Sequence, residues 1–526
     1  MAVHLPSPVA SNRWTRRGIS VLSRDSSAGI AFRDGVFRSA RARTGPLHRL
    51  CRMSVAPLTP GSARPTTLRA LRDTGHQHRA VRTEIRENLL HRLRTGEERF
   101  PGVVGFDATV LPHLERALIA GHDVVLLGER GQGKTRLIRT LTGLLDEWTP
   151  IVGGCPINDH PYAPVCPRCR RIAAEQGDAL AVEWLHRDAR YGEKLATPDT
   201  GVGDLIGDVD PVKLAEGRTL DDPETVHYGL VPRSNRGVFG LNELPDLAAR
   251  VQVALFNVLQ ERDLQVRGHT LRLPLDLLVV ASANPEDYTN RGRIITPLKD
   301  RFGAEIRTHY PQDIAAESAL IRQEAALDGA AEVPDHVVRI VAGFTRLVRA
   351  SPSVDDRSGV SARFAIAAVE TAAASASRRA AVTGERHPVA RVCDLQSVAE
   401  TLRGKIEFEA GEEGRETDVL RHLLRRATSE TYRELLGGAD LGALTELFAT
   451  GATVETGDLV PAADILDRIG PFTGLADLLK RTGAEDTPEE STRGHAAAAV
   501  ELALEGLYLD RHLTKEETNS NSIYRT

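Results

Sequence analysis

The sequence predicts an α/β domain with a parallel sheet, followed by a region built almost entirely from helices. Between about residues 100 and 310, short apolar stretches such as DVVLLG, GVFGL and LDLLVVASAN alternate with amphipathic stretches such as TRLIRTLTGLL. Strands that alternate with helices along a chain usually form a parallel sheet covered by those helices. From about residue 312 onward, nearly every stretch is rich in Ala, Leu and Arg at helical spacing.

The composition is that of a folded protein without a nucleic-acid or membrane signature. A length of 526 residues suffices for about three domains. The net charge of −5 gives no basic footprint for nucleic acid, and no DNA-binding helix-turn-helix signature is present. No run of about 18 apolar residues indicates a membrane span. Five cysteines do not make a secreted disulfide framework, so the cytoplasm is the expected location.

Residues 1–52 differ from the rest of the chain. They contain ten Arg and no Lys, and Asp25 and Asp34 are their only acids. This composition fits a transit peptide. It also fits a disordered or mis-assigned extension, which we favour because the only other methionine, Met53, precedes a loose SVAPLTPGSARP stretch. Residues 53–99 then form an N-terminal segment in which apolar positions recur at helical spacing.

The stretch GERGQGKT fits the phosphate-loop pattern G-x-x-x-x-G-K-[ST] without exception. An apolar strand precedes it and an amphipathic helix follows, which disfavours a chance match. Its glycines let backbone N–H groups curl around phosphates, and the helix N-terminus adds partial positive charge. Lys134 is expected to reach the outer phosphates and Thr135 to hold Mg²⁺. The candidate nucleotide-binding residues are Gly128, Glu129, Arg130, Gly131, Gln132, Gly133, Lys134 and Thr135.

The apolar stretch VFGL ends in Asn242-Glu243, where a strand that serves a nucleotide usually ends in two acids. An Asn keeps an acceptor oxygen but loses the charge. Because Mg²⁺ retains several of its waters, Asn242 could still hydrogen-bond that shell, and it joins the candidate nucleotide-binding set. Glu243 remains to orient the attacking water, although it could instead cap a helix. We therefore expect ATP hydrolysis that is slow or needs high Mg²⁺.

A further apolar strand ends at Asn284. Its side chain is expected near the γ-phosphate, between the strand that precedes the phosphate loop and the strand that ends at Asn242. Arg301 follows on the short segment RIITPLKDRF, where it could offer its charge to a neighbour's nucleotide. Most arginines are simply solvated surface residues, so Arg301 by itself only weakly indicates such a role.

Together these motifs resemble an AAA+ ATPase, and more narrowly the clade of magnesium chelatase subunit I (the small motor subunit) and the MoxR-like ATPases. FPGVVGFD resembles the segment beside the adenine pocket, and CPINDHPYAP resembles a loop of chelatase motor subunits. GDLIGDVDPVKLAEG resembles their second-helix insertion, and GVSARFAIA resembles the sensor-2 segment of the lid. The likeness covers about residues 100–375.

The resemblance implies an AAA+ α/β ATPase core over 100–315 and a helical lid over 316–400, and it leaves 401–526 as a further helical region. It implies ATP and Mg²⁺, with Asn284 as sensor 1 and Arg363 as sensor 2. Arg301 becomes an arginine finger that acts in trans, which implies a ring, usually a hexamer. Two departures stand out. Asn242 replaces an Asp, and the pair Lys299-Asp300 replaces Leu-Asp.

Three functions remain open. The first is a ring motor that drives remodelling of a partner complex, with metal insertion into a tetrapyrrole as its chelatase form. The second is a MoxR-like chaperone that matures a protein complex. The third is an ATP-gated switch with slow turnover, built around Asn242. The first two families work with a von Willebrand-type domain, and this chain lacks its Asp-x-Ser-x-Ser pattern, so a partner protein is expected to supply it.

Three cysteines fall within fifteen residues, in the pattern C-x4-H-x5-C-x2-C. A C-x2-C turn can place two thiolates on one Zn²⁺, and Cys3His is a known structural zinc set. The candidate ligands are Cys155, His160, Cys166 and Cys169, with His186 as an alternative fourth ligand. Three reduced thiols in a loop remain the other interpretation. The stretch TKEETNSNSIYRT at 514–526 is expected to be a frayed tail.

Overall fold

The computed structural model describes residues 64–526, apart from 218–222, 261–262, 267–268, 286–292, 330, 356–358, 485–490 and 519–520. The chain divides into two units, Met1–Met53 and Ser54–Thr526, and all described residues belong to the second. The predicted extension over 1–52 and the first residues of the predicted N-terminal helical segment lie outside the described part.

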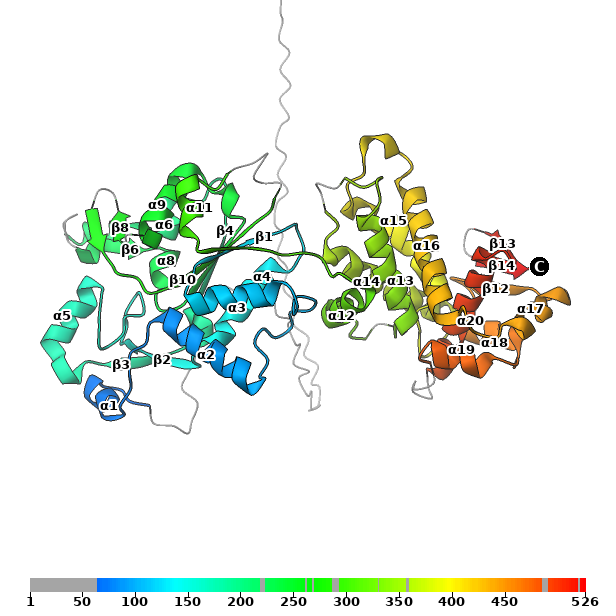
Figure 1. Cartoon of the computed structure of the whole chain (residues 1–526), viewed down its shortest axis with the longest axis horizontal. Coiled ribbons are helices and arrows are strands. Elements are labelled where there is room, and N and C mark those ends of the chain that lie inside the picture. The colour runs from blue at the N-terminus through cyan, green and yellow to red at the C-terminus, as the bar shows by residue number, and fades with distance from the viewer. Residues whose placement is uncertain are drawn as a thin grey trace, which may run out of the picture. The chain divides into compact units, whose positions relative to one another are not determined.

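Five strands form a parallel sheet, which confirms the predicted α/β class (Figure 1). The strand order is β11-β1-β10-β7-β4, and every neighbouring pair is parallel. All carboxyl ends therefore meet at one edge, where open α/β sheets bind their ligands. The strands are β1 (Val124–Leu127), β4 (Tyr191–Leu195), β7 (Val238–Asn242), β10 (Leu278–Ala283) and β11 (Ala304–Arg307).

Alternate residues of the central strands enter two different cores, because side chains alternate across a strand. Val124 of β1 packs in a core that includes α2 (Val81–Thr95), α3 (Val110–Ala120) and α4 (Lys134–Thr140). Val125, its neighbour, packs in the opposite core with α9 (Ala249–Gln260) and α11 (Thr296–Arg301). Strands covered on both faces read as continuous apolar runs, which is why these strands were predictable.

Several small elements are inserted into this α/β frame. They include three antiparallel strand pairs, called hairpins below, and the short helices that accompany them. One of these hairpins begins in the stretch GDLIGDVDPVKLAEG, which resembles a second-helix insertion. The hairpins are β2 (Trp148–Val152) with β3 (Val182–His186), β5 (Gly207–Val209) with β6 (Val226–Tyr228), and β8 (Asp263–Val266) with β9 (His269–Arg272). The helices are α1 (Leu68–Asp73), α5 (Pro167–Gln176), α6 (Val202–Leu205), α7 (Pro211–Ala215) and α8 (Leu230–Arg233).

One hydrophobic core runs through the lid and the region after it, from Ile321 to Tyr524. The predicted lid and C-terminal region thus share their packing across residue 400. No helix in the described ranges is long and apolar enough to cross a bilayer. The helices are α12 (Ile314–Glu324), α13 (Asp335–Arg349), α14 (Ala362–Thr383), α15 (Gln396–Leu402), α16 (Glu416–Leu436), α17 (Gly442–Ala449), α18 (Ala462–Ile469), α19 (Leu475–Arg481) and α20 (Thr492–Leu509).

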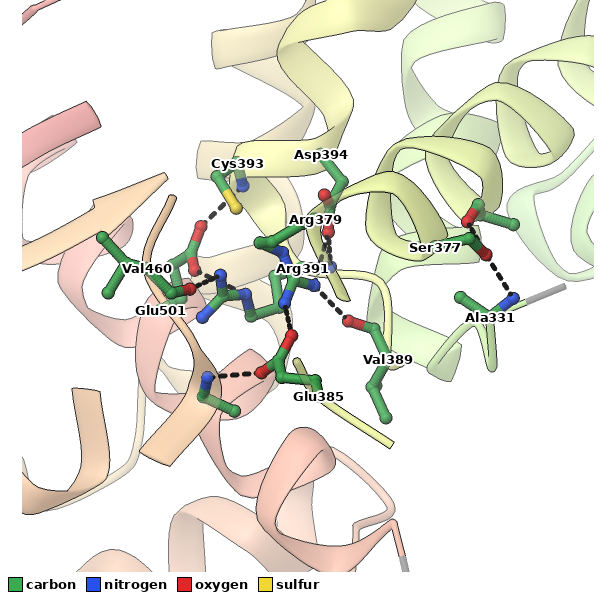
Figure 2. A network of polar contacts seen from close by, with 12 residues as sticks. Ala331, Ser377, Arg379, Glu385, Val389, Arg391, Cys393, Asp394, Val460 and Glu501 are labelled. Carbon is green, nitrogen blue, oxygen red and sulfur yellow. Dashed lines mark hydrogen bonds and ion pairs between the residues drawn. The ribbon is translucent and has the colours of Figure 1, made fainter. Parts of the chain in front are cut away.

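Two fully buried arginines tie segments of this helical region together (Figure 2). Arg379 of α14 forms ion pairs with Glu385 and, at 3.1 Å, with Asp394. Arg391 lies beside it and pairs with Glu501 of α20 at 3.5 Å. Buried ion pairs are costly to break because the remaining charge loses its partner, so α14, the 385–394 segment and α20 are held as one body.

The expectation of a frayed tail at 514–526 is wrong. The segment forms β13 (Thr514–Glu517) and β14 (Asn521–Arg525), which join β12 (Val454–Gly457) in an antiparallel sheet with β14 in the middle. Ser522 and Tyr524 are buried, and the Tyr524 hydroxyl donates to the carboxylate of Glu505. The segment looked frayed because most of its residues are polar, while its apolar contact depends on alternate positions of one short strand.

Candidate functional site

The loop between β1 and α4 needs glycine at several positions. Gly131 and Gly133 have φ of 74° and 77°, in the left-handed region that favours glycine. A Cβ at Gly128 would lie 2.0 Å from Oγ1 of Thr308, and a Cβ at Gly131 would lie 1.9 Å from Oγ of Ser361. The loop is therefore tightly enclosed and has the left-handed glycines that let backbone N–H groups turn toward a phosphate.

Lys134 places its amine inside this loop rather than in solvent. The residue is 6% exposed, and its Nζ donates to the Glu129 carbonyl and to Oδ1 of Asn284, both at 2.8 Å. The loop motif and the end of β10 are thus brought together, as the sequence predicts for a lysine and a sensor that serve the same phosphate.

Asn242 uses both ends of its amide. Its Oδ1 accepts hydrogen bonds from Oγ1 of Thr135 at 3.1 Å and from Oγ of Ser282 at 3.2 Å. Its Nδ2 donates to Oε1 of Glu193 at 2.7 Å. An aspartate could accept the first two hydrogen bonds but could not donate the third. The amide at this position is therefore matched to a neighbouring carboxylate.

That carboxylate, Glu193, is a site residue that the sequence reasoning missed. It lies on the edge strand β4, and the register pairs it with Gly240 of β7, next to the Asn242 side chain. Its Oε2 also accepts from Nε of Arg139 at 2.8 Å and from the Tyr191 hydroxyl at 3.0 Å. The hydrogen bond with Glu193 raises the pKa of Arg139, and burial raises the pKa of Tyr191, so both remain donors. The stretch YGEKL has no apolar run, so only its pairing with β7 reveals the residue.

Glu243 follows the strand end in a strained conformation. Its φ of 56° and ψ of 47° are left-handed, which is uncommon for a residue with a side chain and is found at functional sites. Its Oε2 accepts from Nδ2 of Asn284 at 2.5 Å. Asn284 therefore contacts Lys134 through its oxygen and Glu243 through its nitrogen. Glu243 precedes a short helical turn but makes no side-chain cap there, which argues against the capping interpretation.

The other loop residues are held by contacts with the segment after β11. The Gln132 Oε1 accepts from Oγ1 of Thr308 at 2.7 Å, and the Arg130 carbonyl accepts from the Tyr310 hydroxyl at 2.8 Å. The Arg130 side chain is exposed and Glu129 is half-buried. These contacts fix the shape of the loop around Lys134.

The two predicted arginines lie outside this cluster of hydrogen bonds. Arg301 ends α11, is exposed, and has its guanidinium carbon 5.2 Å above the ring of Phe256. Arg363 is exposed in the first turn of α14, where its backbone N–H donates to Oγ of Ser361 at 3.1 Å. Because Ser361 borders Gly131, Arg363 stands two residues from the lid residue that touches the phosphate loop.

The three predicted cysteines do come together, but the fourth predicted ligand is wrong. One ligand atom each from Cys155, Asp159, Cys166 and Cys169 lies within 4.8 Å of the others. The chain turns at Asn158, whose φ is 58°, and this turn directs the next residue, Asp159, toward the thiols.

His160 faces a different cluster. Its ring centroid lies 5.5 Å from that of His76 and 4.3 Å from that of His78, and its Nδ1 accepts the Tyr162 backbone N–H at 3.0 Å. The alternative ligand His186 lies 4.9 Å from the Trp148 ring, at the start of the β2–β3 hairpin. Neither histidine is among the four grouped ligand atoms.

Electrostatics within the cysteine cluster differ from residue to residue. Hydrogen bonds with Cys166 and Cys169 lower the pKa of Cys155 to about 4, and the hydrogen bonds with Cys155 raise the pKa of Cys166 and of Cys169. Burial raises the pKa of Asp159 to about 7.

Three known families or proteins are similar to the part of the chain that contains this site. The Sigma-54 interaction domain family matches residues 220–301, which include β7, β10 and Arg301. The magnesium-chelatase 38 kDa subunit of Cereibacter sphaeroides is 28% identical over 214 residues, which are 39% of this chain and 56% of that protein. The same subunit of Acidiphilium rubrum is 30% identical over 210 residues, with the same coverage of both chains. This chain carries an AAA+ ATPase domain. The resemblance to magnesium chelatase subunit I is confirmed, and the match spans a little over half of these relatives' own length.

One similar solved structure is described as a model of the complex between subunits BchI and BchD of magnesium chelatase. The structural match to one chain of that complex spans 76% of this chain and 94% of the matched chain. Its identity is 18% and its TM-score is 0.33. The fold assignment rests instead on the parallel sheet and its order.

The residues of the AAA+ domain fit an ATP–Mg²⁺ substrate. Mg²⁺ prefers oxygen ligands and retains waters, and the Thr135 hydroxyl and the Asn242 carbonyl lie 3.1 Å apart with Glu193 behind them. The ammonium of Lys134 lies in the adjoining loop and supplies the positive charge that phosphates need.

Proposed function

We propose that the chain is an ATP-hydrolysing ring motor that drives conformational remodelling of a partner complex. The observation that carries the proposal is the hydrogen-bonded series Lys134–Asn284–Glu243. It joins the group that neutralises phosphate charge to the carboxylate that serves the attacking water, through the residue expected to sense the γ-phosphate.

Each residue has a defined part in the hydrolysis. Lys134 would bind the outer phosphate oxygens, and Thr135 would hold Mg²⁺, whose charge would neutralise those oxygens when ATP is bound. Glu243 accepts a hydrogen bond from the water that attacks the γ-phosphorus, and the bond to the β-phosphate oxygen breaks to give ADP and phosphate. Asn284 orients Glu243, and Asn242 orients the Thr135 hydroxyl that would hold Mg²⁺. Binding and cleavage at this loop can move the lid, because Ser361 touches Gly131.

Arg301 is proposed to act on the nucleotide of a neighbouring copy. It is exposed and lies apart from the hydrogen-bonded series in its own chain, which is what a finger offered in trans requires. Heterologous contacts between identical subunits close into rings, and a hexamer is the ring size we propose. Arg363 is proposed as the sensor of the lid.

In the chelatase form of the proposal, the motor serves metal insertion into a tetrapyrrole, and a partner protein supplies a von Willebrand-type domain. The named relatives support this form over the matched part of the chain. The proposal also locates the chain in the cytoplasm, since its described cysteines are free thiols.

One observation favours the MoxR-like alternative, in which the motor matures a protein complex. The matches to the chelatase subunits cover only 39% to 44% of this chain. The lid, in addition, shares one hydrophobic core with the C-terminal region. A motor whose lid is fused to a large further body is suited to moving that body against a protein partner. The slow switch, the third alternative, rests on Asn242.

The test is complementation between two inactive variants. Glu243→Gln should bind ATP without hydrolysing it, and Arg301→Ala should leave its own ring without a finger. Mixed at equal amounts and exchanged into common rings, they should recover turnover at about one quarter of interfaces, because one partner supplies Glu243 and the other supplies Arg301. Arg468→Ala, at an exposed arginine of α18, is the matched control and should retain full activity.

Two results would contradict the motor. The first is a mixture that shows no turnover although each variant binds nucleotide and forms rings, which would contradict the role of Arg301 as a finger in trans. Wild-type chain that binds ATP but does not hydrolyse it at any Mg²⁺ concentration supports the switch instead. A further assay separates the chelatase and MoxR forms. ATP-dependent acceleration of metal insertion into a porphyrin supports the chelatase form, whereas no acceleration with retained binding of a protein partner supports the MoxR form.

A further inference from the structure

The four grouped ligands of the β2–β3 insert lie close to the spacing of a tetrahedral metal site. Their ligand atoms lie within 4.8 Å of one another. Zinc–sulfur bonds of about 2.3 Å in a tetrahedron put sulfurs about 3.8 Å apart, so a contraction of about 1 Å completes the site. Cys166 and Cys169 are buried and Cys155 is half-buried, which suits a closed site.

Backbone hydrogen bonds already orient the thiols as in a metal knuckle. Cys166 caps α5, and its Sγ accepts the Cys169 backbone N–H at 3.3 Å. The Sγ of Cys155 accepts the Asp159 N–H at 3.2 Å. Such N–H donors stabilise negative charge on these two sulfurs and orient them.

Asp159 supplies an independent observation. Its Oδ2 accepts two backbone N–H groups, from Val165 at 3.0 Å and from Cys166 at 2.8 Å. Its Oδ1 is buried and has no hydrogen-bond partner among the described residues. A buried carboxylate oxygen without a partner is costly, and a cation on the side of the thiols removes that cost.

We propose that Cys155, Asp159, Cys166 and Cys169 bind one Zn²⁺ in a closed, four-coordinate structural site. Three soft sulfur ligands favour zinc over the Mg²⁺ of the nucleotide site. Four protein ligands leave no open position, so the metal is structural rather than catalytic.

The site holds a loop that reaches the catalytic strand. Within it, the Asn158 amide donates to the Arg233 carbonyl at 2.9 Å, and the Asn235 amide donates to the Ile157 carbonyl at 2.9 Å. The segment 233–235 leads directly into β7. Zinc therefore fastens the CPINDHP loop against the segment that enters β7 at its amino end, and the opposite end of the same strand carries Asn242.

The test is the metal content of the full chain, purified without chelators and measured for several elements by mass spectrometry. We expect about one zinc per chain, lost in Cys155→Ser, Cys166→Ser and Cys169→Ser and weakened at least tenfold in affinity in Asp159→Asn. Two matched controls should keep the metal. They are Cys393→Ser, at a buried thiol of the helical region, and His160→Gln, at the histidine beside the site.

A second measurement does not depend on variants that could misfold. Cobalt(II) bound in place of zinc to the wild-type chain should give thiolate-to-cobalt charge-transfer absorption and a tetrahedral visible spectrum. Three results would overturn the proposal: wild-type chain without stoichiometric metal after growth in added zinc, a disulfide between two of the three cysteines, or loss of metal in His160→Gln with retention in Asp159→Asn. None of these readouts requires ATP hydrolysis, so failure of the motor proposal leaves this one intact.

Discussion

Restoring the family's aspartate by Asn242→Asp should destabilise this protein when Mg²⁺ is absent. In the wild type, the Asn242 Nδ2 donates to Oε1 of Glu193 at 2.7 Å. The substitution replaces that N–H donor by a carboxylate oxygen, so an attractive contact becomes a repulsion between two acids. Both residues are largely buried, Asn242 at 5% exposure and the Glu193 side chain at 15%.

The size of the effect follows from the geometry. Two carboxylates whose charge centres lie about 4 Å apart repel by about 4 kcal/mol at an effective dielectric constant of about 20. Arg139, at 2.8 Å and 3.0 Å from the two Glu193 oxygens, offsets part of this repulsion. We therefore expect a loss of about 2–3 kcal/mol in the free energy of unfolding, or roughly 5–10 °C in Tm for a domain of this size.

The assay is thermal unfolding of wild type, Asn242→Asp, Glu193→Gln and the double variant, with and without Mg²⁺ and ATP. Glutamine at 193 can donate to an aspartate, so the double variant should recover most of the lost stability, which gives a coupling of about 2 kcal/mol in the cycle. Mg²⁺ with ATP should also narrow the deficit, because the metal attracts both carboxylates. Asn257→Asp, on a half-buried position of α9, is the control for the substitution itself. If Asn242→Asp unfolds at the wild-type temperature without Mg²⁺, Glu193 does not explain the amide.

Two further predictions concern buried charge. Burial and the neighbouring His495 lower the pKa of His336 to about 4, so the folded state disfavours the proton that the unfolded chain takes up below about pH 6.5. The free energy of unfolding should thus fall by up to about 3 kcal/mol as pH falls from 6.5 to 4. Urea unfolding at pH 7.5 and at pH 5 should show a smaller decrease for His336→Phe than for the wild type. An equal loss in both proteins would refute it. Glu84 accepts two hydrogen bonds at 2.7 Å from the fully buried Arg190. Glu84→Gln should therefore lower the free energy of unfolding by about 3–5 kcal/mol in chemical unfolding. A decrease below about 1 kcal/mol would contradict this account.

Local pattern explains what the sequence could predict. The phosphate loop is contiguous, and the strands before it and before Asn242 are buried on both faces, so apolar runs mark them without any knowledge of pairing. The order of motifs then places Asn284 next to Lys134, and the structure contains that contact.

The missed features depend on which residues meet across the fold. Glu193 becomes part of the site only through the register of β4 on β7. Asp159, rather than His160, faces the thiols because of one left-handed residue, Asn158, and spacing alone treats adjacent positions as interchangeable. The strand pairing of residues 514–526 was likewise invisible, because its partner, Val454, lies about seventy residues away.

The middle position of β14 sets an order of events during synthesis. β12 and β13 each pair with β14, so the sheet cannot form until residues 521–525 have left the ribosome. Until then Glu505 lacks the Tyr524 hydroxyl that it binds in the folded protein. The parallel sheet, by contrast, is complete in sequence by Arg307. Since domains fold as units while the chain emerges, the ATPase core can be folded when the helical body is still incomplete, and that body is the part most in need of protection from premature association.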